Sequence, residues 1–138
     1  MRTYKIAAIP GDGIGTEVIE AGLEVLDALA ARDGGFRVEA RHFDWGSERY
    51  LRDGAMMPVD GLEQLRPHDA IYFGSAGDPR VPDHVTLWGL RLAICQPFDQ
   101  YANVRPARIL PGVESPLRGV KSGDLDWVIV RENSEGEY

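Results

Sequence analysis

The first 43 residues carry the pattern that most limits the fold of this chain. An apolar run at residues 5–9 ends at a Pro-Gly pair, which is typical of a buried strand. Apolar residues then recur at helical spacing until a pair of glycines, with Thr16 as the expected helix cap. Residues 36–43 read as a second strand. A strand, a helix and a strand in this order predict one unit of an α/β sheet.

The rest of the chain continues to alternate between short helices and extended segments. We expect helices at residues 47–53, after Asp60 and at 88–100, and extended segments at 70–74, 101–110 and 125–130. Glu63 follows Asp60 by three positions, which is a capping-box pattern. Pro97 must bend or end the helix that contains it. The alternation predicts an α/β fold in which helices cover both faces of a sheet.

Composition excludes several classes of protein. Hydrophobic residues make up 43% and charged residues 27% of the sequence, which is ordinary for a folded domain. A net charge of −7 argues against nucleic-acid or anionic-membrane partners, and no apolar run reaches the roughly 20 residues that span a bilayer. The single cysteine, Cys95, excludes an internal disulfide. Because the start shows no signal-peptide pattern, we expect a cytoplasmic location.

The end of the sequence is unusual for a self-sufficient domain. The apolar segment 125–130 is followed only by the polar residues 131–138, so nothing after it can cover the strand. We therefore expect the chain to be the N-terminal part of a longer protein, truncated within its fold.

A glycine-rich loop follows the first strand. Gly11, Gly13 and Gly15 lie between a strand and a helix start, where backbone N–H groups and the helix dipole favour an anion or a nucleotide. The spacing is Gly-x-Gly-x-Gly and lacks the G-x-G-x-x-G dinucleotide fingerprint. The second strand closes on His42 and Phe43, so it does not end on an acidic residue that could bind a ribose. A structural turn in which the backbone packs closely fits the spacing equally well.

Arginines and a tyrosine in the second half are the candidate substrate residues. Arg105 lies in an extended segment, and Arg131 ends the last strand, where a guanidinium could clamp a carboxylate. Exposed surface arginines account for both equally well. Tyr138 could act as a general acid in a site that perturbs it, although a terminal tyrosine is usually just exposed. The scattered histidines and the acids after residue 131 show no metal-binding spacing, so no metal ligand is assigned within the chain.

Several blocks of the sequence resemble one enzyme family. Residues 9–18 (IPGDGIGTEV), 103–106 (NVRP) and 130–138 (VRENSEGEY) are similar to the isocitrate and isopropylmalate dehydrogenase family. Residues 43–47 (FDWGS) and 83–92 (DHVTLWGLRL) look most like its tartrate and D-malate dehydrogenase branch. The resemblance extends over the whole chain in register.

The resemblance implies an isopropylmalate dehydrogenase-like, two-domain α/β subunit without Rossmann topology. Residues 1–100 would begin its large domain and residues 101–138 its small domain, with the remainder of both domains missing. It also implies a homodimer that uses NAD and Mn²⁺ or Mg²⁺ to oxidise and decarboxylate a small 2-hydroxy diacid, such as tartrate or D-malate. The metal ligands and the lysine base would lie beyond residue 138, so we expect the isolated chain to be inactive.

The same resemblance implies roles for individual residues. Arg105 and Arg131 match arginines that bind substrate carboxylate groups, and Tyr138 matches the tyrosine that protonates the enol left by decarboxylation. The implied cofactor residues are Gly13, Ile14 and Gly15 near the adenosine, and Thr86 and Trp88 near the nicotinamide.

Two positions depart from the family pattern. Cys95 stands where the family's first substrate arginine would fall, and Arg91, one helical turn earlier, is the candidate replacement. Trp88 stands where isopropylmalate enzymes usually carry a glutamate, which argues against isopropylmalate as the substrate. Two other hypotheses stay open: a stand-alone module that binds a nucleotide or phosphate, and a non-catalytic remnant that associates with a full-length relative. The module hypothesis predicts that the isolated chain folds and binds a nucleotide by itself.

Overall fold

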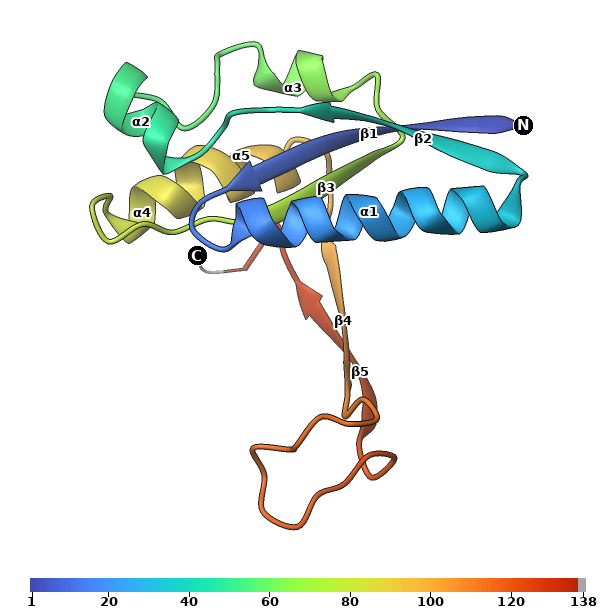
Figure 1. Cartoon of the computed structure of the whole chain (residues 1–138). Helices are drawn as coiled ribbons and strands as arrows, with labels where there is room; N and C mark the ends of the chain where they lie inside the picture. Colours follow the sequence, from blue (N-terminus) through green and yellow to red (C-terminus); the bar gives the residue numbers. More distant parts are fainter. Residues whose placement is uncertain (137–138) are drawn as a thin grey trace. The chain divides into compact units, whose positions relative to one another are not determined.

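Two separate β-sheets organise the chain, one in each of two units. The computed structural model describes residues 1–136, and the chain divides into a first unit at Met1–Ile94 and a second unit that begins at Cys95. The first sheet is parallel and the second is antiparallel (Figure 1). The predicted α/β class is confirmed. The boundary expected at residue 100 lies inside the second unit, and the assignment of the two units to two enzyme domains stays a prediction.

β1 (Arg2–Gly11) is the central strand of the first sheet. β2 (Phe36–His42) pairs with one of its edges and β3 (Ala70–Ser75) with the other, both in parallel. Residues 7–9 of the central strand are fully buried. The apolar run predicted from the sequence is therefore the middle of this strand, which extends further at both ends because it forms backbone hydrogen bonds on both sides.

α1 (Gly15–Asp33) follows the first strand and contacts all three strands of the sheet (Figure 1). Ile19 is fully buried on its inner side. The helix ends at Gly34, whose left-handed backbone (φ 72°) lets its N–H donate to the carbonyl oxygen of Ala30. The prediction of Thr16 as the helix cap is wrong, because the N-cap position falls on an isoleucine whose side chain cannot accept a hydrogen bond.

Two short helices lie between β2 and β3. α2 (Ser47–Asp53) coincides with the helix predicted there. α3 (Gly61–Leu65) follows Asp60 as predicted, but the capping box does not form. The Oδ1 atom of Asp60 accepts a hydrogen bond from the Nε2 atom of Gln64 at 3.1 Å, and Glu63 forms an ion pair further along the chain. Side-chain pairing within the helix therefore replaces the expected cap.

A longer helical segment follows β3 and contains a π-helical turn. It consists of α4 (Asp83–Thr86), the π turn η1 (Leu87–Arg91) and α5 (Leu92–Cys95). The helix predicted at residues 88–100 therefore begins and ends earlier than expected. It starts directly after one proline and stops before the next, Pro97, whose ring cannot continue a helix.

The second unit is built on an antiparallel pair of strands. β4 (Ala102–Arg108) pairs with β5 (Asp126–Glu132), and a loop at residues 109–125 joins them (Figure 1). These strands confirm the extended segments predicted in this part of the chain. The pair exposes large apolar side chains: Val104, Trp127, Val128, Ile129 and Val130.

Replacing Ile19 by alanine is expected to lower the free energy of unfolding by about 2–5 kcal/mol, because the lost side chain leaves a cavity beneath α1. Val25 lies on the same helix and is 66% exposed, so Val25→Ala is the matched control. The control should change the free energy of unfolding by no more than about 0.5 kcal/mol. Urea unfolding followed by circular dichroism measures both variants, and equal losses would contradict the packing described for this helix.

Candidate functional site

The loops that follow β1, β2 and β3 share the carboxyl edge of the parallel sheet. Ligands of open α/β sheets bind at this edge, beyond the ends of the strands. A cavity of about 240 Å³ lies there, beside the ends of β1 and β2. The residues that line it include Pro10, Gly11, Thr16, Phe43, Trp45 and Arg49. The packing of this edge decides what the glycine loop can hold.

Three glycines bring backbone segments at this edge into direct contact. A Cβ atom on Gly11 would lie 1.9 Å from the carbonyl oxygen of Ser75. A Cβ atom on Gly15 would lie 2.0 Å from the carbonyl oxygen of Pro10, and one on Gly74 would lie 2.3 Å from the same oxygen. Only glycine fits such close approaches. The structural interpretation of the glycine spacing therefore accounts for Gly11 and Gly15.

Gly13 and Ile14 form the exposed tip of the glycine loop. A Cβ atom on Gly13 would meet nothing within 4 Å, although its φ of +54° still favours glycine. The Ile14 side chain is 66% exposed. This tip is the part of the loop that can contact a cofactor, while Gly15 supports it from inside.

Asp12 is the buried carboxylate of this edge, and it was not among the residues predicted from the sequence. The residue is 5% exposed. Its Oδ1 atom accepts a hydrogen bond from the Ser47 backbone N–H at 2.6 Å, and its Oδ2 atom accepts from the Ser47 hydroxyl and the Gly77 N–H, both at 2.8 Å. One side chain thus joins the loops after all three strands. An acidic residue inside a tight glycine turn is the signal that could have identified it, because a buried carboxylate needs donors from neighbouring segments.

An exposed ion-pair cluster fastens the loop after β3 to α2. The Nη2 atom of Arg80 donates to Asp78 Oδ2 at 2.7 Å and also to the Glu48 carboxylate. Hydrogen bonds from the Arg80 side chain and N–H lower the pKa of the Asp78 carboxyl to about 2. Exposed pairs of this kind add little stability, so the cluster mainly restricts where the loop can lie.

The helical segment after this loop carries three of the predicted site residues. Thr86 is buried, and its hydroxyl donates to the carbonyl oxygen of Asp83 at 3.0 Å. That hydroxyl is therefore already used inside the helix. Trp88 is 47% exposed, which makes it the accessible member of the pair expected near the nicotinamide. Arg91 is half-buried in the first unit.

Arg105 and Arg131 lie on one face of the antiparallel strand pair. Arg105 is opposite Ile129 and Arg131 is opposite Asn103. Because side chains alternate along a strand and paired residues point the same way, both guanidinium groups belong to the same face. The sequence led us to place Arg131 beyond a strand of a parallel sheet. This placement is wrong, because β5 belongs to an antiparallel pair.

The Glu132 carboxylate shapes the turn that follows β5. It accepts hydrogen bonds from the backbone N–H groups of Ser134, of Glu135 at 2.5 Å and of Gly136 at 2.6 Å. The N–H groups of Glu135 and Ser134, which favour the charged form, lower the pKa of the Glu132 carboxyl to about 2. Tyr138, the predicted general acid, lies outside the described residues.

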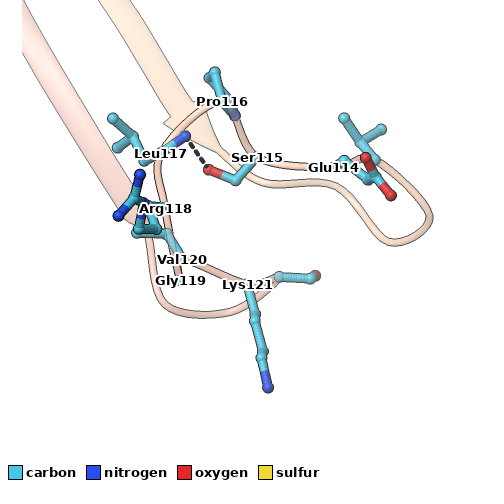
Figure 2. Close-up of a pocket in the computed structure, with 10 residues that line it drawn as sticks. Glu114, Ser115, Pro116, Leu117, Arg118, Gly119, Val120 and Lys121 are labelled. Carbon is cyan, nitrogen blue, oxygen red and sulfur yellow. Dashed lines mark hydrogen bonds between the residues drawn. The ribbon is translucent and has the colours of Figure 1, made fainter.

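A further hollow on the described surface holds none of the predicted site residues. A hollow of about 490 Å³ is formed by the loop at residues 113–122 alone, where the Leu117 N–H donates to the Ser115 hydroxyl oxygen at 3.1 Å (Figure 2). In the described part of the chain, no three His, Cys, Asp or Glu side chains gather as metal ligands. Nor does any helix within that part have the length and apolar character to cross a membrane.

The parallel sheet with its glycine-packed edge, followed by an antiparallel strand pair, defines the chain as an α/β protein. The chain belongs to the isocitrate/isopropylmalate dehydrogenase family, whose family model matches residues 5–138. The resemblance stated from the sequence motifs is thereby confirmed.

Two relatives of the chain carry the names of decarboxylating dehydrogenases. The chain is 68% identical over 138 residues to a probable tartrate dehydrogenase/decarboxylase of Agrobacterium vitis. It is 54% identical over 140 residues to the D-malate dehydrogenase (decarboxylating) of Escherichia coli. These matches cover 100% of the chain, which spans only 38% of the length of either relative.

Solved structures of the family share the fold. A β-decarboxylating dehydrogenase of Thermococcus kodakarensis matches 96% of this chain and 35% of its own, with a TM-score of 0.68 and 33% identity. An isocitrate dehydrogenase of Methylococcus capsulatus matches the same shares, with a TM-score of 0.75 and 28% identity. The family fold predicted from the sequence is confirmed.

Replacing Gly15 by alanine is expected to lower the free energy of unfolding by about 3 kcal/mol or more, because its Cβ would collide with a backbone carbonyl that cannot move aside. Gly13→Ala is the matched control from the same loop. Its Cβ has open space, so only the left-handed backbone should cost about 1 kcal/mol. Thermal unfolding measures the difference, and equal effects would mean that the close approach at Gly15 is not rigid.

Lowering the pH should release the turn after β5 only in strong acid. The pKa of Glu132 is depressed from its ordinary 4.5 to about 2, so its contribution is fully present above pH 4.5 and is lost as the pH falls through about 2. The amide proton shifts of Glu135 and Gly136, followed by NMR during an acid titration, should report that midpoint. The Glu132→Gln variant should lack the transition, and a midpoint near 4.5 in the parent chain would contradict the carboxylate cap.

Proposed function

We propose that this chain forms the N-terminal part of an NAD-dependent oxidative decarboxylase of small 2-hydroxy diacids, such as tartrate or D-malate. The observation that carries the proposal is 68% identity over all 138 residues to a relative named as a probable tartrate dehydrogenase/decarboxylase. The D-malate dehydrogenase (decarboxylating) of Escherichia coli supports the same class of substrate at 54% identity. Activity belongs to the longer protein that carries this segment, because the chain spans 38% of such relatives.

In this proposal the arginines hold the two carboxylate groups of the substrate. Arg105 and Arg131 lie on one face of the strand pair, where planar guanidinium groups can form paired, charge-assisted hydrogen bonds with carboxylates. Arg91 would take the place of the family arginine that aligns with Cys95. The turn closed by Glu132 follows Arg131 directly. Tyr138, which lies outside the described residues, is the proposed proton donor to the enol carbon.

The cofactor would contact the accessible residues of the first unit. Gly13 and Ile14 would lie against the adenosine, and Trp88 would lie against the nicotinamide. Gly15 and Thr86 are buried, so they would not contact the cofactor directly but would pack beneath the residues that do. NAD, when bound, would supply the acceptor for the hydride on C2 of the substrate, and the carboxylate β to the resulting ketone would be the group lost as CO₂.

The ligands of a Mn²⁺ or Mg²⁺ ion are proposed to come from sequence beyond residue 138. Among residues 1–136, no three His, Cys, Asp or Glu side chains gather as metal ligands. The complete protein is likewise proposed to be a homodimer.

A chimera tests this function directly. Residues 1–138 would replace the matching segment of the Agrobacterium vitis relative, which is 68% identical there. With Mn²⁺ present, the chimera is expected to reduce NAD in the presence of D-malate or tartrate, measured by the absorbance of NADH. Failure to reduce NAD with any 2-hydroxy diacid, in a folded chimera, would reject the proposal.

Within the chimera, Arg131→Lys is expected to lower kcat/KM for the diacid by about 10- to 100-fold, because an ammonium group cannot replace two parallel hydrogen bonds. Arg118→Lys is the matched control, since Arg118 lies in the exposed loop at residues 113–122. That control should keep kcat/KM within about twofold. Equal effects of the two substitutions would remove Arg131 from the substrate site.

A further inference from the structure

We propose that Asp12 is a positioning residue for the cofactor surface of the first unit. Its carboxylate fixes the loop after β3 beside the exposed tip of the glycine loop. The functional part of this inference rests on the function proposed above. The geometric part stands on the hydrogen bonds of the chain itself.

Asp12 uses both its backbone and its side chain to join separate segments. Its N–H donates to the carbonyl oxygen of Ser75 at 2.8 Å, and its own carbonyl accepts from the Gly15 N–H at 3.0 Å. The side chain then accepts from Ser47, at the start of α2, and from Gly77, in the loop after β3. A residue next to the loop tip is thus hydrogen-bonded to the end of β3, the start of α1, the start of α2 and the loop after β3.

The two partner loops adopt unusual backbone conformations around this carboxylate. Gly46, which precedes Ser47, has a φ of +149°, and a Cβ atom there would lie 2.8 Å from Asp12 Oδ1. Gly77 has a φ of +148° and donates its own N–H. L-amino acids with a side chain rarely adopt such φ values. The loop after β3 therefore uses glycine at the residue whose N–H donates to Asp12, and the loop after β2 uses glycine directly before Ser47, whose N–H donates to the same carboxylate.

Asp12 acts on the cofactor surface through the loop that it holds. Gly77 is followed by the ion-pair cluster of Asp78 and Arg80 and then by the helical segment that carries Trp88. A shift of Gly77 would therefore move the beginning of this chain segment relative to Gly13 and Ile14. We therefore expect Asp12 to affect cofactor binding more than the chemical step.

Asp12→Asn is a sharp test because it changes only one oxygen to an NH₂ group. If the amide oxygen still accepts the hydrogen bond from the Ser47 N–H, the new NH₂ group faces the Gly77 N–H. Two hydrogen-bond donors then point at each other. If the amide turns over, the same conflict falls on the Ser47 N–H. Either way, one backbone N–H that donates to Asp12 loses its acceptor, and we expect the binding equilibrium that depends on this loop to change by about tenfold.

The experiment uses the chimera of residues 1–138 with the Agrobacterium vitis relative and compares wild type with Asp12→Asn. We expect the KM for NAD to rise about tenfold with kcat changed less than about twofold. Amide hydrogen exchange at Gly77 or Ser47 should accelerate by about tenfold or more. Asp33→Asn is the matched control, because its carboxylate accepts one backbone N–H, from Gly35, at the opposite edge of the sheet. The control should leave KM, kcat and exchange at Gly77 unchanged.

Ser47→Ala keeps the inference testable if Asp12→Asn does not fold. It removes only the hydroxyl bond at 2.8 Å, so a rise of about two- to fivefold in the KM for NAD is expected. If folded Asp12→Asn shows unchanged amide exchange at both Gly77 and Ser47, the inference is overturned. An unchanged KM for NAD, in folded Asp12→Asn or in Ser47→Ala, would overturn it as well. A wild-type chimera that cannot reduce NAD would instead reject the proposed function, and hydrogen exchange would still decide the geometric part.

Discussion

The close approach of backbone segments at Gly11, Gly15 and Gly74 is the constraint on which the first unit depends. At these positions a carbonyl oxygen occupies the space where a side chain would begin. β1, the start of α1 and the end of β3 can therefore sit closer together than side chains allow. The packing uses most of the glycine loop for structure and leaves only its tip accessible. It also explains why the loop lacks the dinucleotide fingerprint, because its glycines fit backbone neighbours instead of a pyrophosphate.

The fold was largely predictable from the sequence because its signals are local. The buried run at residues 5–9, the helix that ends at Gly34 and the helix at 47–53 all follow from apolar spacing and turn residues. The expected cap at Thr16 does not form because the helix begins earlier, at Gly15, and the expected capping box at Asp60 does not form, since that carboxylate accepts from Gln64 instead. Strand pairing was harder to predict, since nothing in the sequence near β5 distinguishes a parallel neighbour from an antiparallel one.

Residues of the candidate site could be predicted from the sequence only where they lie in a recognisable sequence pattern. Arg105 and Arg131 are candidates from their places in extended segments, the family resemblance gives them a role, and the strand register gives a reason for both to share a face. Asp12 was missed, although it lies inside the same glycine motif, because its partners Ser47 and Gly77 are 35 and 65 residues away in the sequence. Contacts over such separations leave no local periodicity. A buried carboxylate is therefore recognised from the donors that surround it in the folded chain.

In each of the two units, one carboxylate accepts hydrogen bonds from several backbone N–H groups. Some of the acidic residues of the chain therefore have a structural role. The chain has 22 acidic residues and a net charge of −7. Asp12 in the first unit and Glu132 in the second each collect backbone N–H groups from loops that would otherwise lack partners. Oxygens engaged in this way are poor candidates for metal ligands, which fits the lack of a ligand cluster among residues 1–136. In the described part of the chain, Asp12 and Glu132 therefore act on loop geometry, each by accepting backbone N–H groups of neighbouring residues.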